Sequence, residues 1–483
     1  MSFVQSHQLW TDEAQDAAKR LSARLRNGEL KRLRFGWADQ HGLVRGKALF
    51  AQRAEAALEN GVGFVGTNLL KDSSDRTTQA VFTRGAGFGS EDFEGAADVL
   101  LVADPLSFVE LPWSPGSGWV QCQPYFYRGE RRGQLVPFDT RGVLQRCLES
   151  AHRQSYQMRV GLEVECHLFR LAGQAIDVTD LGWPGAAPAV NPLSMGYRLL
   201  SEQRYDKLEP VVDLLTEPLI AMGLPLESVE VELGPSQLEF VFGPQDALAG
   251  ADTMLQFRHA AKQIMQRHGY HISFMCRPAL PHAMSSGWHL HQSLISLDSG
   301  RNVFCDPKPL ASGLAASGHH YLGGLVRHAA AGTVFATPTI NGYRRYRPNA
   351  LAPERINWGR DNRGAMLRVV GGGEDPATRI ENRVGEPAAN PYLYLASQLA
   401  AGLEGIAQQA DPGASADEPY ASEYPLLPRT LDQALAALAD DPFYSKAFGQ
   451  EFIDYYSQLK QFELARFHLE VTEWEQREYF DLF

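Results

Sequence analysis

Five short segments of the chain place charged or metal-ligating side chains at every second residue. In a β-strand this spacing directs them to one face, while the residues between them point to the other. In the first segment, Glu163 and Glu165 alternate with the apolar Leu162, Val164 and Cys166. The other segments carry Glu230 and Glu232, Gln237 and Glu239, His289 and His291, and Arg379, Glu381 and Arg383. Because unpaired buried charge is costly, neighbouring strands of this kind predict bound cations and a metal-dependent enzyme.

Arginines form a second pattern. Nine arginines and no lysine occur between Arg344 and Arg383, although the protein as a whole is acidic. The guanidinium group binds phosphate and carboxylate in a bidentate way, so this segment predicts a site for such anions. Carboxylates for divalent cations together with arginines for phosphoryl oxygens indicate phosphoryl transfer from a nucleotide. For four of the nine, an ordinary salt-bridged surface is the favoured interpretation: Arg344, Arg347, Arg355 and Arg360.

Composition limits the classes of protein that need to be considered. The 483 residues carry a formal net charge of -12, which argues against nucleic acid or anionic membranes as main partners. The five cysteines are widely spaced and form no C-x-x-C pair, which favours a reducing cytoplasm over a disulfide framework or a structural zinc site. The N-terminus lacks the apolar core of a signal peptide, and no apolar run reaches the length of a membrane span. We therefore expect a cytoplasmic protein.

Periodicity and caps indicate an α+β protein with two domains. We expect two short strands within residues 33–50, joined by a turn from Asp39 to Gly42, and a buried strand at 99–105. Residues 85–95 read as a loop. Helices are predicted at 12–27, from the cap Asp139 to about 157, and at 246–268, 389–408 and 430–438, followed by a helical C-terminus. An irregular Pro/Gly-rich region places the domain border near 130–137, which gives domains of residues 1–135 and 136–483.

Several motifs together resemble those of the glutamine synthetase family. In order they read GLEVECHLF, ELGPSQLEF, SGWHLHQSL, NGYRRYRP, RGAMLRV and RIENRVGEPAANPY, and the resemblance extends over nearly the whole chain from DQHGLVRGK. It implies a small N-terminal β-grasp domain and a large C-terminal catalytic domain with a curved antiparallel sheet. It also implies a homo-oligomer, a hexameric ring or a stacked dodecamer, with active sites shared between neighbours.

The resemblance assigns roles by motif position. It implies two or three Mg²⁺ or Mn²⁺ ions per subunit, held by mostly oxygen ligands. The implied ligands of the first ion are Glu165, Glu232 and Glu239, and those of the second are Glu163, His289 and Glu381. Arg345 and Arg383, with Glu165, match the residues that hold glutamate. Arg363 and Arg368 match arginines that neutralise the transferred phosphate and act in catalysis with Arg345. The implied nucleotide contacts are Ser293, His291, Arg363 and Arg379, although His291 could also be a polar core residue.

The family chemistry has two steps. ATP phosphorylates the γ-carboxylate of glutamate, and an amine then displaces phosphate from the acyl phosphate. Electrostatic stabilisation of the transition state by cations and arginines supplies most of the rate enhancement, and each such group lowers the barrier by about 3–4 kcal/mol.

The departures from the family pattern concern ammonium. Leu351 stands where glutamine synthetases have a flap glutamate, and Val65 aligns with an aspartate of the N-terminal domain; both acids serve ammonium. Ammonium needs anions to capture and deprotonate it, so their replacement leaves an apolar amine pocket. We expect this pocket to include Val65, Leu351, Met284 and Trp288, although Trp288 could instead pack a core. The chain thus resembles γ-glutamylpolyamine and γ-glutamylamine synthetases, and the apolar residues favour a bulky or aromatic monoamine.

Other interpretations stay open. Glu354, Asp72 or Asp75 could restore ammonium binding and make the chain an ammonia-using glutamine synthetase. A polyamine-specific ligase, a ligase for an acid other than glutamate, and an inactive relative are further alternatives. Retention of the full set of cation ligands argues against the last of these.

Overall fold

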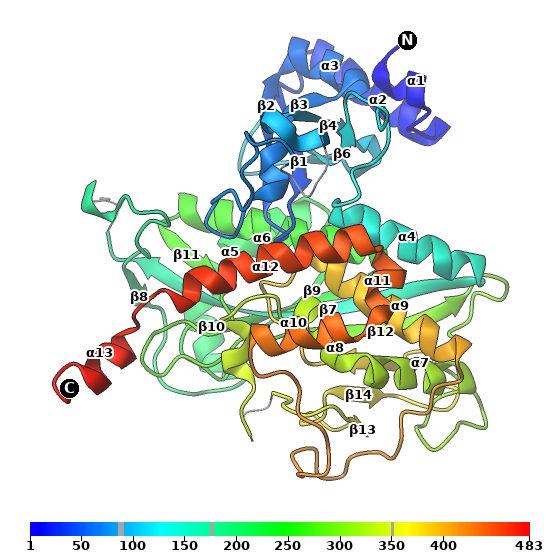
Figure 1. The fold of residues 1–483 in the computed structure, drawn as a ribbon, viewed down its shortest axis with the longest axis vertical. Helices are drawn as coiled ribbons and strands as arrows, with labels where there is room; N and C mark the ends of the chain where they lie inside the picture. Colours follow the sequence, from blue (N-terminus) through cyan, green and yellow to red (C-terminus); the bar gives the residue numbers. More distant parts are fainter. Residues whose placement is uncertain (86–90, 174–177, 349–351) are drawn as a thin grey trace.

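The chain forms a small N-terminal sheet domain above a larger domain with a long sheet (Figure 1). The computed structural model describes residues 1–85, 91–173, 178–348 and 352–483. Within these ranges the N-terminal sheet has six strands in the order β2-β1-β6-β4-β3, with β5 beside β6, and β1 runs parallel to β6. Its strands are β1 (Arg32–Ala38), β2 (Val44–Phe50), β3 (Val62–Val65), β4 (Asp98–Ala103), β5 (Val109–Glu110) and β6 (Ser117–Phe126). The helices around it are α1 (Phe3–His7), α2 (Asp12–Arg26) and α3 (Ala51–Asn60).

The second sheet runs in the order β13-β14-β15-β12-β7-β10-β9, and β8 and β11 also pair with β7. All its pairings are antiparallel except that between β13 and β14. Its strands are β7 (Tyr156–Leu171), β8 (Val190–Pro192), β9 (Leu226–Val231), β10 (Gln237–Asp246), β11 (Tyr270–Ser273), β12 (Trp288–Ser296), β13 (Trp358–Arg360), β14 (Leu367–Val370) and β15 (Arg379–Asn382). The fold is therefore α+β with a small sheet domain and a large catalytic-type domain, as predicted.

Helices cover this sheet and extend beyond it. They are α4 (Thr140–Arg153), α5 (Glu202–Ala221), α6 (Ala247–Arg267), α7 (Ala316–Arg327), α8 (Ala329–Ala336), α9 (Pro391–Ala407), α10 (Leu431–Asp440), α11 (Pro442–Phe448), α12 (Gln450–His468) and α13 (Glu473–Tyr479). Figure 1 shows α12 crossing the large domain and α13 projecting from it at the C-terminus. None of the helices in the described ranges is both long and apolar enough to cross a membrane.

Side-chain caps start several of these helices where the sequence predicts. Thr11 accepts a hydrogen bond from the Ala14 amide at the start of α2, and Asp139 accepts one from Gly142 at the start of α4. The helix predicted from Asp139 to about 157 is too long. It ends at Arg153, because Ser155 takes a left-handed backbone conformation (φ 60°) and the chain enters β7. Of the predicted loop at 85–95, residues 86–90 lie outside the described ranges, and Glu91–Ala96 forms a 3₁₀ turn.

The two domains are joined through the predicted turn between β1 and β2. The buried guanidinium of Arg258, on α6, donates to the carbonyls of Gly42 (2.9 Å) and Ala389 (2.8 Å). Asn390 caps α9 through its side-chain oxygen, and its amide nitrogen donates to the Asp39 carbonyl at 3.1 Å. The turn therefore docks the small sheet onto the start of α9. The predicted border between residues 135 and 136 lies between β6 and α4.

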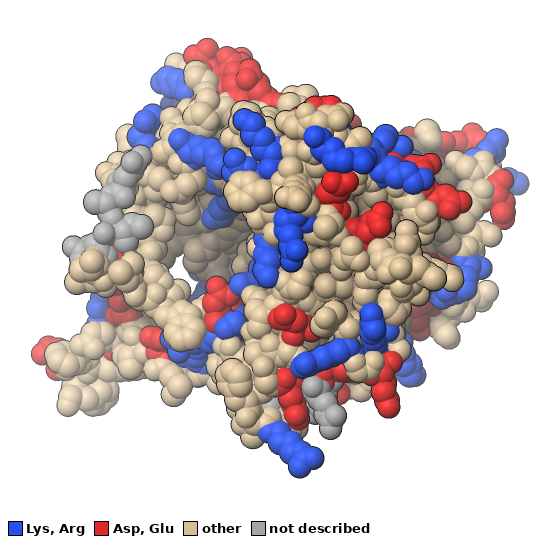
Figure 2. Space-filling model, turned by 90° about the horizontal axis from the view of Figure 1, so that it is seen from above, with Lys and Arg blue, Asp and Glu red and all other residues tan. Residues whose placement is uncertain are grey.

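Charged side chains are mixed over the upper face of the molecule. Figure 2 shows Lys and Arg interspersed with Asp and Glu on this face. The acidic surplus of the chain is therefore not gathered into one patch on this side.

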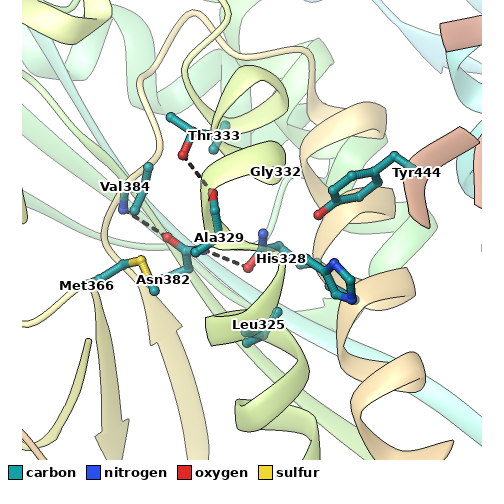
Figure 3. A pocket seen from close by; sticks show the side chains of 12 residues that line it. Leu325, His328, Ala329, Gly332, Thr333, Met366, Asn382, Val384 and Tyr444 are labelled. Atoms are coloured by element: carbon teal, nitrogen blue, oxygen red, sulfur yellow. Dashed lines mark hydrogen bonds between the residues drawn. The ribbon is translucent and has the colours of Figure 1, made fainter. Parts of the chain in front are cut away.

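Behind the large sheet, a buried histidine connects three helices. His328 precedes α8, and its ring nitrogens lie 2.7 Å from an Asp441 oxygen and 3.2 Å from a Glu404 oxygen. Figure 3 shows it with Tyr444 on one side of a small cavity that has Met366, Asn382 and Val384 on the other. The cavity measures about 20 Å³, enough for one water molecule. The hydrogen bonds of the histidine thus connect α8, α9 and α11 beside this cavity, where side-chain packing is incomplete.

We predict that His328→Ala lowers the free energy of unfolding by about 2 kcal/mol, because it leaves two partly buried carboxylates without this partner. Urea unfolding at pH 7 measures the change. His152→Ala, which removes an exposed imidazole, is the matched control and should stay within about 0.5 kcal/mol of wild type. Equal effects of the two substitutions would contradict this role.

Candidate active site

Strand register brings the predicted ligands together on one face of the large sheet. Glu163 and Glu165 lie on β7, the central strand of the site. Glu163 stands opposite His289 on β12, and Glu165 stands opposite Glu239 on β10. On the far side of β12, His291 is in register with Glu381 of β15. Because the side-chain period of a strand is two, all these groups share one face.

The first predicted ligand set forms one compact cluster. Glu165, Glu232 and Glu239 each offer an oxygen within 4.8 Å of the others. Glu232 follows the end of β9, and its amide donates to the Gln237 carbonyl at 3.1 Å. The Gly287 amide donates to Glu165 at 3.0 Å and orients that carboxylate. The structure therefore places three carboxylates where one cation could be shared.

The second predicted set adjoins the first. His289 Nδ1 lies 3.4 Å from Glu163 and 3.7 Å from Glu381. Two overlapping groups satisfy the same 4.8 Å limit: Glu163 with Glu239 and His289, and Glu163 with His291 and Glu381. Glu163 thus lies at the meeting point of the clusters. His291 belongs to one of these groups, so it is a candidate ligand as well as a predicted nucleotide contact.

The electrostatics of the face fit bound cations. Burial, with repulsion from Glu165 and Glu163, raises the pKa of Glu239 to about 10. Burial and the charge of Glu232 raise the pKa of Glu165 to about 7. Burial and the nearby Arg383 lower the pKa of His289 to about 4, which leaves the neutral imidazole that metals bind. Oxygen donors with a neutral imidazole match the preferences of hard divalent cations.

The pKa of Glu163 is shifted in the opposite direction. Burial alone would raise its pKa, but hydrogen bonds with His289 and His291 lower it below the ordinary value. His291 Nε2 lies 2.8 Å from one Glu163 oxygen. The shared carboxylate is therefore ionised, while Glu239 on β10, with its pKa of about 10, holds its proton in the metal-free chain.

Arginines border the acidic face. Arg345 is buried, donates to the Arg383 carbonyl at 2.7 Å and lies 3.3 Å from His289. Arg368 donates to Glu381 at 3.1 Å, and Arg383 pairs with the other oxygen of the same carboxylate. Nε of Arg383 is buried and has no hydrogen-bond partner in the described chain. That unsatisfied donor is available to a substrate carboxylate.

An open pocket of about 420 Å³ adjoins this cluster between β7, β10 and β12. Among its lining residues are Glu163, His291, Ser293 and Arg379. Nε of Arg379 donates to Nδ1 of His291 at 2.9 Å, which connects the pocket to the cation ligands. The predicted nucleotide contacts Ser293, His291 and Arg379 therefore line one cavity. Arg363 does not line it and is exposed.

Of the four residues predicted for the amine pocket, the structure describes Val65, Met284 and Trp288, and these three lie in different parts of the fold. Trp288 has no exposed surface and packs edge-on against Tyr394, with ring centroids 5.0 Å apart. It points to the core because it alternates with His289, so it lines no pocket and that expectation is corrected. Met284 lies beside Gly234 at the Glu232 end of the site. Val65 is exposed at the end of β3, and Leu351 lies outside the described residues.

Two positioning residues were not assigned a role from the sequence. Gln237 donates to Glu165 at 3.1 Å and to the Ser285 carbonyl at 3.2 Å, which ties the loop after Met284 to the ligand. The polar alternation of β10 was the available signal for Gln237. A Cβ on Gly287 would lie 2.5 Å from Arg345 Nη2, so only glycine allows this close approach. Sequence alone does not reveal that contact.

A cluster of candidate cation ligands beside arginines and an open pocket is the arrangement expected of a metal-dependent enzyme. The family model described as glutamine synthetase, catalytic domain, matches residues 137–479. The chain therefore belongs to the glutamine synthetase family and is an ATP-dependent glutamate–amine ligase. Family members use divalent metals and ATP.

Individual relatives match along nearly the full length. The chain is 38% identical to a γ-glutamylanilide synthase of an Acinetobacter species, over 100% of this chain and 99% of the relative. It is 31% identical to a glutamine synthetase of Methanosarcina mazei, over 94% and 95% of the two chains. Among solved structures it is similar to GmaS without ligand, with a TM-score of 0.78, 28% identity and coverage of 95% of this chain and 99% of that chain. A complex of GmaS with ADP gives a TM-score of 0.77 at the same identity and coverage.

The elevated pKa of Glu239 predicts a pH-dependent stability of the metal-free protein. Its pKa is about 10 in the folded chain, against a reference value of 4.5 that stands for the unfolded chain. Between these pH values the folded chain therefore binds one proton more than the unfolded chain. Stability then falls as pH rises through this window. We predict that the free energy of unfolding of Glu239→Gln falls less steeply with pH than that of wild type, by up to about 1.4 kcal/mol per pH unit.

Urea unfolding at pH 6 and pH 8, with chelator present, tests the prediction. Glu217→Gln, at an exposed position of α5, is the matched control and should keep the wild-type slope. An unchanged slope in Glu239→Gln would show that this carboxylate is ionised without metal.

Proposed function

We propose that this ligase joins the γ-carboxylate of glutamate to an arylamine, an amine whose nitrogen is attached directly to an aromatic ring. The observation that carries the proposal combines two facts. The structure brings the candidate cation ligands together on one sheet face, and the family resemblance places Leu351 and Val65 where glutamine synthetases carry the two acids that serve ammonium. The full-length likeness to a γ-glutamylanilide synthase supports the aromatic choice.

Charge gives the physical reason. An arylamine is a weak base and is uncharged at neutral pH, so it needs no anion to capture or deprotonate it. Ammonium, alkylamines and polyamines are cations at this pH and need acidic partners. A pocket that exchanges carboxylates for apolar side chains therefore favours the uncharged nucleophile.

The acidic residues that could have replaced the two missing ones already pair with arginines. Glu354 is buried and lies 3.2 Å from Arg429. Asp72 is fully buried, accepts amide hydrogen bonds within its own turn and lies 3.0 Å from Arg466. Asp75 is paired with Arg45 at 2.6 Å. These pairs disfavour both the ammonia-using alternative and a polyamine site built on the same acids.

The proposed reaction uses the site as follows. Arg345 and Arg383 would hold glutamate, and Ser293, His291 and Arg379 would contact ATP in the adjoining pocket. Arg363 and Arg368, with Arg345, would neutralise the phosphate as it moves to the γ-carboxylate. The amine nitrogen then bonds to the acyl carbon, phosphate leaves with the electrons of the carbon–oxygen bond, and the nitrogen releases a proton.

Two ion sites are proposed, with Mg²⁺ or Mn²⁺ held by Glu165, Glu232 and Glu239 and by Glu163, His289 and Glu381. Bound divalent cations would screen the carboxylates and draw charge from the phosphoryl oxygens. We also propose a hexameric ring or stacked dodecamer. In such a ring, the exposed Val65 would line the amine pocket of a neighbouring subunit together with that subunit's Met284 and Leu351.

Phosphate release from ATP, with glutamate and Mg²⁺, tests the proposal against a panel of amines. Aniline and benzylamine are the decisive pair, because they share a ring but only benzylamine is charged at pH 7. We expect turnover to be highest with aniline and low with ammonium and putrescine. Preference for ammonium or putrescine would contradict the proposal, and preference for benzylamine would limit it to a bulky monoamine.

We predict that Leu351→Glu reverses this preference. A carboxylate at this position restores a partner for ammonium and adds a charge to the apolar site, so the ratio of kcat/KM for aniline to that for ammonium should fall about 100-fold, the size of a typical acid–base contribution. Leu351→Met is the matched control and should keep the ratio. A fall with both variants would indicate a packing effect instead.

A further inference from the structure

A second pocket lies away from the cation ligands, next to the segment that carries Arg345. It measures about 320 Å³ and is bounded by three parts of the chain. These are the 3₁₀ turn η5 (Gly342–Arg345) with the residues around it, the start of α10 and the end of α12. Its volume is within the range of sites for small organic ligands.

One side of this pocket is apolar. Tyr343, Tyr346, Leu464 and Phe467 are among its lining residues. The rings of Tyr343 and Tyr346 meet edge to face at 5.9 Å. The buried hydroxyl of Tyr343 has no hydrogen-bond partner within the ranges that the structure describes. The wall is therefore suited to a flat apolar group that carries a polar end.

The other side carries arginines without acidic partners. Arg344 and Arg347 are exposed, and neither forms an ion pair with a carboxylate of the described residues. With the described residues as partners, the only side-chain hydrogen bond from either is that of Arg347 Nε to the Arg344 carbonyl, at 3.2 Å. The salt-bridged surface predicted for these two arginines is therefore not present in the described part of the chain.

The remaining charges of the pocket only partly offset this pair. Arg429 is bound to Glu354, and Asp432 lies 3.7 Å from His468. Burial and, to a smaller extent, the charge of Arg347 lower the pKa of the nearby Arg277, which indicates that positive charges gather here. An anion would relieve this repulsion, and two adjacent guanidinium groups favour a carboxylate.

We propose that this pocket binds a small aryl carboxylate, with the ring against Tyr343 and Phe467 and the carboxylate on Arg344 and Arg347. The combination of an apolar wall with paired arginines distinguishes this ligand from a bare inorganic anion, which would gain nothing from the rings. The described lining residues of this pocket include none of those proposed above for the glutamate and nucleotide sites, and the proposal does not depend on which amine is used.

The pocket is connected to the glutamate site through the backbone of η5. Arg345 is adjacent to Arg344 in this turn and is itself buried on the opposite side, where it donates to the Arg383 carbonyl. Tyr346 donates to the next carbonyl, that of Val384, at 3.2 Å. Because Arg345 and Tyr346 hold adjacent carbonyls of one segment, we expect a ligand against Tyr343 and Tyr346 to hold the substrate arginines more firmly and so to lower the KM for glutamate.

Isothermal titration calorimetry with benzoate tests the site on the full-length protein, with glutamate and ADP at saturating concentration so that the substrate sites are filled. We expect millimolar or tighter binding to wild type and about tenfold weaker binding to the Arg344→Gln/Arg347→Gln double variant, because the charge-assisted pairs are lost. Arg53→Gln, at an exposed position of α3, is the matched control and should bind as wild type does.

Inorganic phosphate and toluene sulfonamide, titrated in the same way, separate the contributions of charge and ring. Binding of benzoate that the double variant does not weaken, absence of binding to wild type, or equal binding of phosphate would each overturn the proposal. As a second readout, benzoate should lower the glutamate KM of wild type about fivefold and leave that of the double variant unchanged. A KM that benzoate does not change would overturn the coupling.

Discussion

Repulsion among carboxylates on one sheet face is the interaction on which the rest of this structure depends. Glu165, Glu232 and Glu239 offer oxygens within 4.8 Å of one another, and Glu163 and Glu381 adjoin them. Without cations, the face lowers its charge by holding protons, as the raised pKa values of Glu239 and Glu165 indicate. Protons relieve this repulsion in the metal-free chain, and the divalent cations that we propose would relieve it at the same oxygens.

The architecture supplies the rigidity that such a face requires. β7 pairs with β10 and β12, and this register sets the spacing of Glu163, Glu165, Glu239 and His289. Backbone and amide donors then orient the carboxylates, as Gly287 and Gln237 do for Glu165. Arginines at the edge of the face pair with Glu381, and Arg345 reaches the same region from η5. Like charges are thus held close because the paired strands and the loops beside them fix each one in place.

Much of this site could be predicted from the sequence, because strand alternation and motif order both select the same face. The period-two pattern of β7 placed Glu163 and Glu165 together. The pairing of β12 with β7 sets His289 opposite Glu163, and the pairing of β12 with β15 sets His291 opposite Glu381. The assignment of Trp288 failed for the same physical reason: the residue before His289 must point into the core. The end of α4 at Arg153 depended on the left-handed backbone of Ser155, which no side-chain pattern reveals.

Manganese bound to crystals of the protein with ADP gives the most direct test of the central claim, because its anomalous scattering locates each ion. The account predicts one peak among Glu165, Glu232 and Glu239 and a second beside Glu163, His289 and Glu381, with the nucleotide phosphates reaching them from the pocket lined by Ser293 and Arg379. A structure with bound ADP and no anomalous peak at these carboxylates would contradict it.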